Sequence, residues 1–316
     1  MGLHLLVDEG RQVLRGSGLD TPEHDARVLL AETAGSDLHD LDRGLLLGWG
    51  LDRFAAPGRA ADQVLQDYHD CLQRRSDREP LQYILGHAAF RMLDLDVGPG
   101  VFIPRPETET VVQAGLDWLT DRGLPTPLVV DLCAGSGAVG LSVATEVHGA
   151  RVWAVEASEE AATWTRRNVD AQSETLVEQG SAYRLVLGDA TSGKVLAELN
   201  GRVDLVISNP PYIPQDRMPT QPEVRNWDPE MALYGGSPDG CLIPQGIIRR
   251  SADLLRPGGA LVMEHDCSQG EALRRLARQE GFGKVETGQD LAGRDRYLMA
   301  VRSDGPTGSR PAHGAQ

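Results

Sequence analysis

Seven short runs with the character of strands, most of them apolar, follow one another after Pro127, and they limit the possible fold more than any other feature of the chain. Each run has the length of a strand, and helical patterns separate most of them. The expected strands are Leu128–Leu132, Arg151–Val155, Tyr183–Leu187, Val203–Ser208, Gly259–Glu264, Lys284–Thr287 and Arg296–Val301. Strands that alternate with helices are typical of a parallel sheet covered on both faces. The sequence therefore predicts a seven-stranded α/β domain over residues 111–302.

Residues 1–85 carry a helical pattern, because apolar side chains recur there at spacings of three and four. One helix is expected to begin after Thr21 as its cap, with Pro22 at the first position and Gly35 just beyond its end. A later helix is expected around Val64–Leu72. The pattern predicts a small helical bundle. Since it shows no chemistry of its own, we expect this domain to recognise the substrate.

Residues 86–110 are predicted to connect the two domains through a β-hairpin and an extended segment. Apolar and acidic side chains alternate between Phe90 and Val101, and glycines punctuate the pattern. In Ile103–Glu109, with the sequence Ile-Pro-Arg-Pro-Glu-Thr-Glu, two prolines enforce an extended backbone. Such a backbone holds Arg105 and Glu107 in defined directions.

Two further segments stand outside the regular pattern. The connection from Ser208 to Gly259 is far longer than a crossover needs, so we expect it to contain loops with a function. Residues 303–316 are rich in Gly, Pro and polar side chains, and we expect this tail to be disordered.

The charge balance argues against nucleic acid as a ligand. With 31 Lys+Arg against 46 Asp+Glu, the formal net charge is −15, and a surface this acidic repels a phosphate backbone. Residues 1–85 contain nine Arg, no Lys, 11 Asp and four Glu, which amounts to 9 − 15 = −6. The acidity instead favours the hypothesis of a protein partner with a basic face.

The sequence predicts neither a membrane span nor a metal site. Its longest uncharged stretch, Leu132–Thr145, is shorter than the about 20 apolar residues of a transmembrane helix. The residues after Met1 lack the pattern of a secretion signal, so we expect a cytoplasmic protein. The four cysteines are far apart and form no Cys-x-x-Cys pair, which argues against zinc and disulfides. His265 and Cys267 lie close in sequence without a matching set of metal ligands.

A strand, a glycine-rich turn and a helix follow one another over Val129–Gly140, with Cys133-Ala134-Gly135-Ser136-Gly137 as the turn. Glycine is needed where a ligand approaches the backbone closely. The spacing of the three glycines, with Glu156 21 residues after Gly135, fits a dinucleotide site. It also fits an S-adenosylmethionine site, because in both an acid after the second strand binds ribose hydroxyls. These residues alone leave both cofactors open.

Two carboxylates favour S-adenosylmethionine. Asp131 lies at the end of the first strand, where it can meet a cationic or amino group and would repel a pyrophosphate. Asp189 follows the third strand and can accept from the adenine amine while the N–H of Ala190 donates to the ring. The alternative for Asp189 is an ordinary helix cap.

Asn209-Pro210-Pro211-Tyr212, after the fourth strand, resembles the signature of methyltransferases that act on planar nitrogens. An amide nitrogen is a poor nucleophile because its lone pair is delocalised, so a catalyst must hold its hydrogens and aim it at the methyl group. The Asn209 side-chain oxygen and the Pro210 carbonyl are two acceptors suited to this. Tyr212 offers a ring that packs on the planar group. We therefore expect Asn209, Pro210 and Tyr212 to be catalytic.

Together the motifs resemble the HemK-type protein-(glutamine-N5) methyltransferases, which modify class I peptide chain release factors. The resemblance spans roughly residues 5–301. Besides the glycine-rich turn and the Asn209–Tyr212 motif, it is carried by Glu79–Gly86, Phe90, Val101–Glu109, Asp228–Gly236 and Asp239-Gly240.

The resemblance implies a class I S-adenosylmethionine-dependent methyltransferase fold, a Rossmann-like domain behind a helical bundle and a β-hairpin. It implies methyl transfer from S-adenosylmethionine, leaving S-adenosylhomocysteine, to the glutamine of a Gly-Gly-Gln motif in a release factor, by a monomer without metal. The implied cofactor residues are Asp131, Cys133, Ala134, Gly135, Ser136, Gly137, Glu156, Asp189, Ala190 and Asn209. The implied substrate residues are Phe102, Pro104, Arg105, Glu107, Asn209, Pro210, Pro211 and Tyr212. The alternative for Arg105 and Glu107 is that they only pair with each other.

The chain departs from the family pattern at three places. Cys133 stands where the family has the first glycine of the cofactor turn, and Ala190 stands where an aromatic residue is frequent. Ala171–Ala182 resembles an insertion, and we expect a surface loop there.

Three rival functions are weighed against this one. A DNA adenine methyltransferase uses a similar motif but needs a basic target-reading domain, which the charge of −6 contradicts. A NAD-dependent oxidoreductase makes no use of Asn209. A non-enzymatic adaptor on the same fold would not need the residues of the cofactor turn, and their intact presence here argues against it.

Overall fold

The structure is a computed structural model that describes residues 1–304 in two compact units. Unit 1 consists of Met1–His87 together with Pro219–Trp227. Unit 2 consists of Ala88–Met218 and of the described chain from Asp228 onward. The tail predicted to be disordered lies, from residue 305, outside the described residues.

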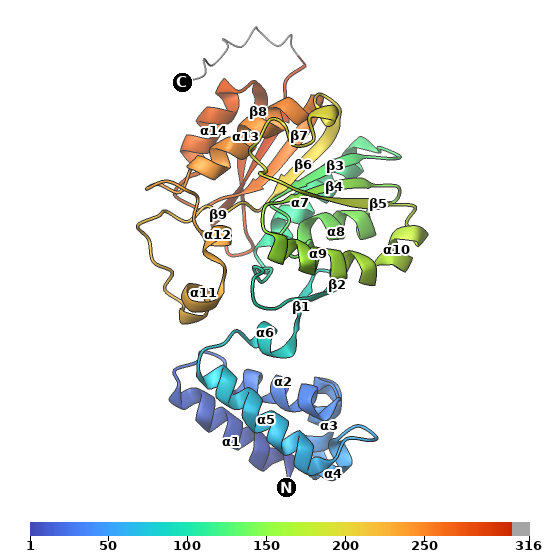
Figure 1. Ribbon diagram of the computed structural model, residues 1–316, viewed down its shortest axis with the longest axis vertical. Helices are drawn as coiled ribbons and strands as arrows, with labels where there is room; N and C mark the ends of the chain where they lie inside the picture. Colours follow the sequence, from blue (N-terminus) through green and yellow to red (C-terminus); the bar gives the residue numbers. More distant parts are fainter. Residues whose placement is uncertain (305–316) are drawn as a thin grey trace. The chain divides into compact units, whose positions relative to one another are not determined.

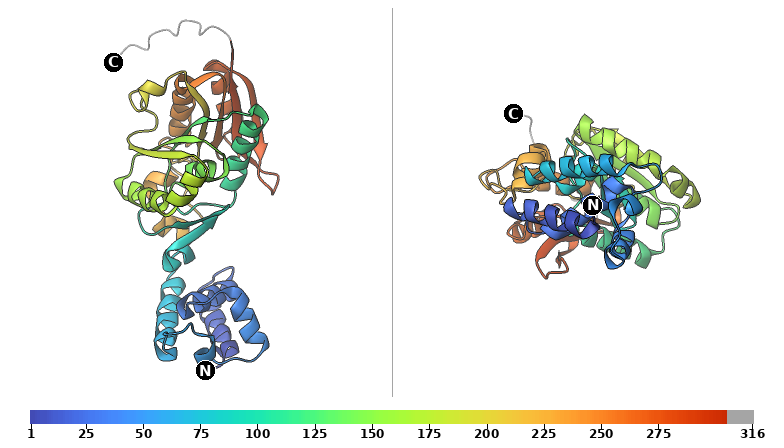
Figure 2. Two further views of the ribbon diagram at one scale, coloured as in Figure 1. Left: turned by 90° about the vertical axis from the view of Figure 1, so that its right-hand side faces the viewer. Right: turned by 90° about the horizontal axis from the view of Figure 1, so that it is seen from below.

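Unit 1 is a helical bundle, drawn from blue to cyan for its first segment in Figures 1 and 2. Its helices are α1 (Leu3–Gly16), α2 (Pro22–Ala34), α3 (Leu38–Leu46), α4 (Leu51–Phe54), α5 (Ala61–Ser76), α6 (Leu81–Leu85) and α11 (Pro222–Trp227). The apolar stripes of α1 to α6 meet in one core that contains the fully buried Leu6, Leu29 and Tyr68. Gly35 ends α2 in the left-handed region, with φ 65°. The helical pattern predicted for this part is confirmed.

Thr21 is the exception, because its side chain does not cap α2. Its hydroxyl donates to Asp25 Oδ1 at 2.8 Å instead of accepting a backbone N–H. Asp25 is buried, and its other oxygen accepts from Arg75 Nε at 2.8 Å. A buried carboxylate needs donors for both oxygens, and Thr21 supplies one of them.

Helix α11 belongs to unit 1 through a cluster of charged side chains. Glu223 accepts from Arg75 Nη1 at 3.0 Å and from Arg78 Nη2 at 2.8 Å. No residue of α11 is buried, although Val224 and Trp227 are half-buried, and the ion pairs join the helix to Arg75 of α5 and to Arg78. No pattern in the sequence indicates that residues so far along the chain complete the helical bundle.

Unit 2 is built around a seven-stranded sheet in the order β5-β4-β3-β6-β7-β9-β8. The strands are β3 (Leu128–Leu132), β4 (Arg151–Glu156), β5 (Ala182–Leu187), β6 (Val203–Ser208), β7 (Leu255–Glu264), β8 (Phe282–Gln289) and β9 (Asp295–Arg302). β3 to β7 pair in parallel, and β9 is antiparallel to both of its neighbours. All seven expected strands are confirmed; β7 begins earlier than predicted, at Leu255.

Helices cover both faces of this sheet (Figure 1). One face packs against α7 (Thr108–Arg122) and α8 (Ala138–Glu146), and the other against α13 (Leu242–Leu254) and α14 (Gly270–Gln279). The remaining elements are α9 (Glu159–Ala171), α10 (Ser173–Glu178), α12 (Glu230–Leu233) and a 3-10 helix at Ala197–Leu199.

The expectation of a surface loop at Ala171–Ala182 is wrong. The segment forms helix α10, and its Leu176 is buried in the same core as α8. Burial of this one apolar side chain ties the segment to the domain, so it packs as a helix instead of leaving the surface as a loop.

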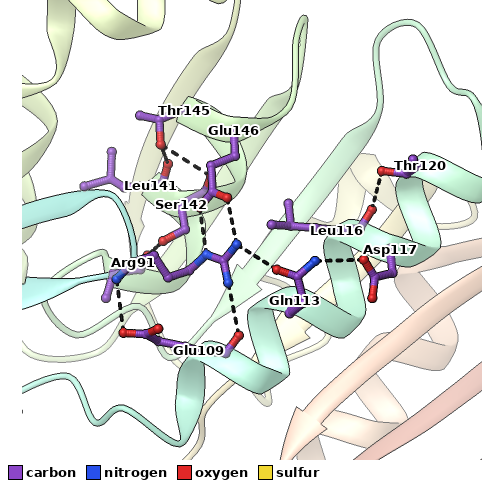
Figure 3. A network of polar contacts seen from close by, with 11 residues as sticks. Arg91, Glu109, Gln113, Leu116, Asp117, Thr120, Leu141, Ser142, Thr145 and Glu146 are labelled. Carbon is purple, nitrogen blue, oxygen red and sulfur yellow. Dashed lines mark hydrogen bonds and ion pairs between the residues drawn. The ribbon is translucent and has the colours of Figure 1, made fainter.

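Arg91 ties the turn of the predicted hairpin, β1 (His87–Phe90) and β2 (Leu93–Asp96), to two helices (Figure 3). Its guanidinium donates to both oxygens of Glu146 on α8, each at 2.7 Å. It also donates to Gln113 Oε1 at 2.9 Å and to the carbonyl of Glu109 at 3.3 Å, both on α7. The planar, bidentate contact fixes the hairpin turn on α8, and the two single hydrogen bonds join it to α7.

Candidate active site

Strand register brings the expected site residues to one edge of the sheet. Leu132 of β3 pairs with Val155 of β4 and with Ser208 of β6, and Ser208 pairs with Met263 of β7. The residue that follows each of these paired residues therefore lies at the same level, two of them just beyond their strands and two as the last residues of theirs. These residues are Cys133, Glu156, Asn209 and Glu264. In open α/β folds this carboxyl edge is where ligands bind.

The glycine-rich turn is held by Glu156. Its carboxylate accepts from the Gly135 N–H at 2.7 Å and from the Ser158 N–H at 2.8 Å. Gly135 and Gly137 have φ 57° and 88°, a region that favours glycine. Cys133, the residue at the family's glycine position, also has a positive φ, of 71°. The backbone shape of a glycine is thus kept here by a residue that carries a side chain.

Asp131 is fully buried behind this turn. Its Oδ2 accepts from the Gly140 N–H at 2.8 Å, whereas its Oδ1 has no hydrogen-bond partner. Burial raises the pKa of Asp131 to about 7, against the opposite effect of the Gly140 N–H. A Cβ on Gly140 would lie 2.9 Å from Oδ2. Asp131 therefore ties strand to helix across the turn, a role that the sequence did not suggest.

Asp189 has the partners of a local turn. Its Oδ1 accepts from the Thr191 N–H at 2.8 Å and from the Thr191 hydroxyl at 2.7 Å. Ala190 between them is buried. The capping alternative is wrong, because no helix begins here and the next helical element is the 3-10 helix at Ala197–Leu199. Any contact of Asp189 with adenine stays a prediction.

Asn209, Thr108, Glu264 and Tyr212 form one hydrogen-bonded chain. Asn209 Nδ2 donates to Thr108 Oγ1 at 3.2 Å, and Thr108 Oγ1 donates to Glu264 Oε2 at 2.7 Å. The Tyr212 hydroxyl donates to the other oxygen, Glu264 Oε1, at 2.9 Å. Burial raises the pKa of Glu264, and its two hydroxyl donors lower it in part. Two residues of the predicted catalytic motif thus converge on one buried carboxylate.

Sequence reasoning missed Glu264 and Thr108. Both lie inside stretches that it singled out, the end of the fifth expected strand and the Ile103–Glu109 segment, but attention went to their neighbours. The available signal was an acid directly after the apolar run Ala260–Met263, at the sheet edge where Asn209 also emerges.

The loop after β6 is closed by a second part of the chain. Gln269 Nε2 donates to the carbonyl oxygens of Tyr212 and Asp239, both at 2.9 Å. A Cβ on Gly240, where φ is 69°, would lie 2.2 Å from the Tyr212 carbonyl oxygen. The second residue of the family's Asp239-Gly240 pair is therefore glycine, because a side chain there would clash with the Tyr212 carbonyl.

Arg105 pairs with a different acid from the one that the sequence suggested. Its guanidinium forms an ion pair with the buried Asp228, and lies 4.8 Å from the centre of the Phe102 ring. Burial raises the pKa of Asp228 to about 6, although Arg105 acts in the opposite direction. Glu107 is exposed. Since Arg105 and Asp228 lie in separate family motifs, their contact joins those motifs; Phe102, Pro104 and Glu107 keep their substrate roles as predictions.

His265 and Cys267 have no shared ligand geometry. His265 is buried with Nδ1 2.8 Å from the Asp266 carbonyl oxygen, and Cys267 is exposed. Within residues 1–304, no three His, Cys, Asp or Glu side chains are grouped to hold a metal ion. Nor does that range contain a helix long and apolar enough to cross a bilayer.

Comparison with known proteins decides the family. The PrmC N-terminal domain family matches residues 6–86, and the family Conserved hypothetical protein 95 matches residues 83–226. A release factor glutamine methyltransferase of Bifidobacterium longum is 58% identical over 296 residues, which cover 94% of this chain and 98% of the relative. The chain belongs to the release factor glutamine methyltransferase family. This membership confirms the resemblance predicted from the motifs.

Two further relatives show the range of this similarity. The release factor glutamine methyltransferase of Streptomyces coelicolor is 41% identical, over 94% of this chain and 97% of the relative. A 4-amino-L-phenylalanine/4-methylamino-L-phenylalanine methyltransferase of Streptomyces pristinaespiralis is 38% identical, over 94% of each chain. At least one relative that matches this chain over most of its length is thus named for a different substrate.

Proposed function

We propose that this chain transfers a methyl group from S-adenosylmethionine to the amide nitrogen of the glutamine in the Gly-Gly-Gln motif of class I peptide chain release factors. The observation that carries the proposal is the orientation of Asn209. Its NH2 group donates to Thr108, which leaves its carbonyl oxygen to accept a hydrogen from the acceptor amide. A site that offers acceptors suits a nitrogen that must lose electron density.

The turn residues fit S-adenosylmethionine. A Cβ on Gly135 would meet nothing within 4 Å, so there is space for a ligand beside this backbone. Glu156 follows the second sheet strand with its carboxylate oriented by two N–H groups, as ribose hydroxyls require. Asp131 Oδ1 is buried and left to accept a hydrogen bond. When bound, this cofactor supplies a methyl group on a positively charged sulfur.

The residues of the Asn209–Tyr212 motif then act on the acceptor nitrogen. Positive charge grows on this nitrogen during transfer, and the Asn209 side-chain oxygen and the Pro210 carbonyl stabilise it through the two amide hydrogens. The Tyr212 ring packs on the planar amide. No strong base is required, because the nitrogen becomes acidic once it is methylated and releases its proton afterwards.

The protein substrate is supported by the relatives and by charge. The relatives at 58% and 41% identity are named for release factors. The net charge of −15 suits a partner that binds the ribosome through a basic face. A second candidate acceptor is a free aromatic amine, favoured by the relative at 38% identity.

One experiment separates the candidates. The protein, expected to sediment as a monomer, is incubated with methyl-labelled S-adenosylmethionine and, in turn, a class I release factor, its Gly-Gly-Gln glutamine variant, DNA and 4-amino-L-phenylalanine. Label in the intact release factor alone supports the proposal. Label in the aromatic amine or in DNA, with none in the release factor, would overturn it.

A matched variant tests the role of Asn209. Asn209→Ala is expected to abolish turnover while calorimetry still detects binding of the cofactor, because the cofactor turn is made by other residues. An active Asn209→Ala enzyme would refute the mechanism.

A further inference from the structure

The Asn209 side chain presents an orientation problem that the motif itself does not solve. The oxygen and the NH2 group of an amide have nearly the same shape, so packing alone cannot choose between two orientations related by a flip. Only one of them offers the oxygen to an acceptor nitrogen. The orientation must therefore be set by a hydrogen-bond partner on the other side of the amide.

Thr108 is that partner, and its own proton is already committed. A hydroxyl has a single proton, and Thr108 Oγ1 directs it to Glu264 Oε2 at 2.7 Å. The Thr108 oxygen can then only accept, and it accepts from Asn209 Nδ2 at 3.2 Å. In a flipped Asn209 the side-chain oxygen would face the Thr108 oxygen, and neither atom would have a proton to donate to the other.

Glu264 holds the other end of the motif as well. Its second oxygen, Oε1, accepts from the Tyr212 hydroxyl at 2.9 Å. Glu264 has 1% of its surface exposed and lies in register with Asn209 on the neighbouring strand. Such a carboxylate is costly to bury, and its two hydroxyl donors come from the site: the tyrosine of the motif and the threonine that holds its asparagine.

We propose that Glu264 is the positioning residue of this active site, which acts through Thr108 to orient the Asn209 amide and directly on Tyr212 to orient its ring. Glu264 is buried, and its two oxygens accept from Thr108 and Tyr212, so we assign it no contact with the acceptor. The inference rests on one part of the proposed function, namely that the acceptor atom is an amide or amine nitrogen.

Kinetics test the proposal with Thr108→Val, which keeps the shape of the side chain and removes the hydroxyl. We expect kcat to fall at least about tenfold, with KM for the release factor and the cofactor dissociation constant within about threefold of wild type. Thr108→Ser restores the hydroxyl and should recover most of kcat. Thr145→Val is the matched control, because Thr145 is a buried threonine of unit 2 whose hydroxyl bonds only to its own helix; its kcat should equal that of wild type.

Glu264→Gln tests whether the effect runs through Thr108. The glutamine keeps one acceptor oxygen and so cannot serve both hydroxyl donors, and we expect a fall in kcat. In the Thr108→Val background the same change should cost about threefold less than in the wild type, because part of the path is already broken. Fully multiplicative effects, or a Thr108→Val enzyme with the kcat of wild type, would overturn the inference.

A measurement without turnover keeps this inference separate from the proposed function. The side-chain NH2 signals of Asn209 in an amide NMR spectrum are assigned by their loss in Asn209→Ala, and they should shift in Thr108→Val and Glu264→Gln but not in Thr145→Val. If the wild type fails to methylate a release factor while these shifts occur, the proposed substrate fails and the positioning role stands. Unchanged Asn209 signals in Thr108→Val would refute the positioning role whatever the substrate.

Discussion

The attachment of helix α11 to the helical bundle of unit 1 leads to a prediction whose size can be worked from the structure. Glu223 is the only acid of α11, and both of its oxygens are used, by Arg75 and by Arg78. No residue of α11 is buried, and its apolar Pro222, Val224 and Trp227 are only half-buried, so we expect the ion pairs to supply a large part of its attachment. Glu223→Ala should therefore release α11 from the bundle while the bundle core stays folded.

The magnitude follows from the two hydrogen bonds. A charge-assisted hydrogen bond contributes about 1.5–3 kcal/mol when buried. The side chains of Glu223 and Arg78 are 19% and 21% exposed, so solvent screens part of this, and about 1 kcal/mol for each bond is a fair value. The loss of about 2 kcal/mol corresponds to an about 30-fold rise in the ratio of released to attached α11.

Hydrogen exchange of the backbone measures this ratio directly. Amides of residues 219–227 should exchange about 30-fold faster in Glu223→Ala, with α2 and α5 unchanged. Asp8→Ala is the matched control, since Asp8 also loses an ion pair in unit 1, with Arg11 at 2.8 Å, but at an exposed site. Equal exchange of residues 219–227 in Glu223→Ala and wild type would show that the ion pairs do not hold α11.

Acid should have the same effect on α11 as the mutation. Desolvation raises the pKa of Glu223, but the hydrogen bonds from Arg78 and Arg75 outweigh it, so the pKa lies below its usual value. A carboxyl whose folded pKa is lowered contributes stability above its unfolded pKa and loses it as the pH falls through the folded value. Exchange of residues 219–227 should therefore accelerate below pH 4.5 in the wild type and show no such acid step in Glu223→Ala.

Three further predictions concern unit 2 and the substrate. Burial raises the pKa of Asp131 to about 7, so the folded protein keeps this proton while the unfolded chain loses it, and stability falls as the pH rises from about 4 to about 7. Asp131→Asn has no carboxyl to titrate, so its free energy of unfolding should not show this fall. The difference in free energy of unfolding between Asp131→Asn and wild type should therefore change by about 4 kcal/mol, in favour of the variant, from about pH 4 to about pH 7. A difference independent of pH would contradict the raised pKa of Asp131. Arg91→Ala leaves Glu146 without its bidentate partner, and denaturant titration should show a loss of about 2–3 kcal/mol, whereas no loss would mean that the hairpin is held by packing alone. The rate of release factor methylation should fall as salt rises, because the charge of −15 attracts a basic partner; a rate unaffected by salt would leave the acidity a matter of solubility.

The regular elements follow from local sequence, and the prediction of them is correct for a physical reason. Leu128–Leu132 and Val203–Ser208 are strands within the bounds expected, because a strand buried on both faces needs mostly apolar side chains, and all but Asp131, Asp204 and Ser208 are apolar here. Gly35 ends its helix where predicted, since a left-handed residue is a local requirement. Where a single contact decides, as for Leu176 in α10, local pattern is insufficient and the prediction is wrong.

The chemistry of the site divides in the same way. The residue types of the glycine-rich turn and of Asn209–Tyr212 narrow the chain to nucleotide-cofactor folds and to methyltransferases of planar nitrogens; the family resemblance needed further segments such as Val101–Glu109 as well. The partners of these residues depend on strand order and register. Glu264 meets Tyr212 across 52 residues and Thr108 across 156, and Arg75 meets Glu223 across 148. Sequence alone predicted the fold and singled out the motif around Asn209; only the tertiary structure showed which partners hold that motif and what completes the helical bundle, because hydrogen bonds between distant segments leave no periodic trace in the chain.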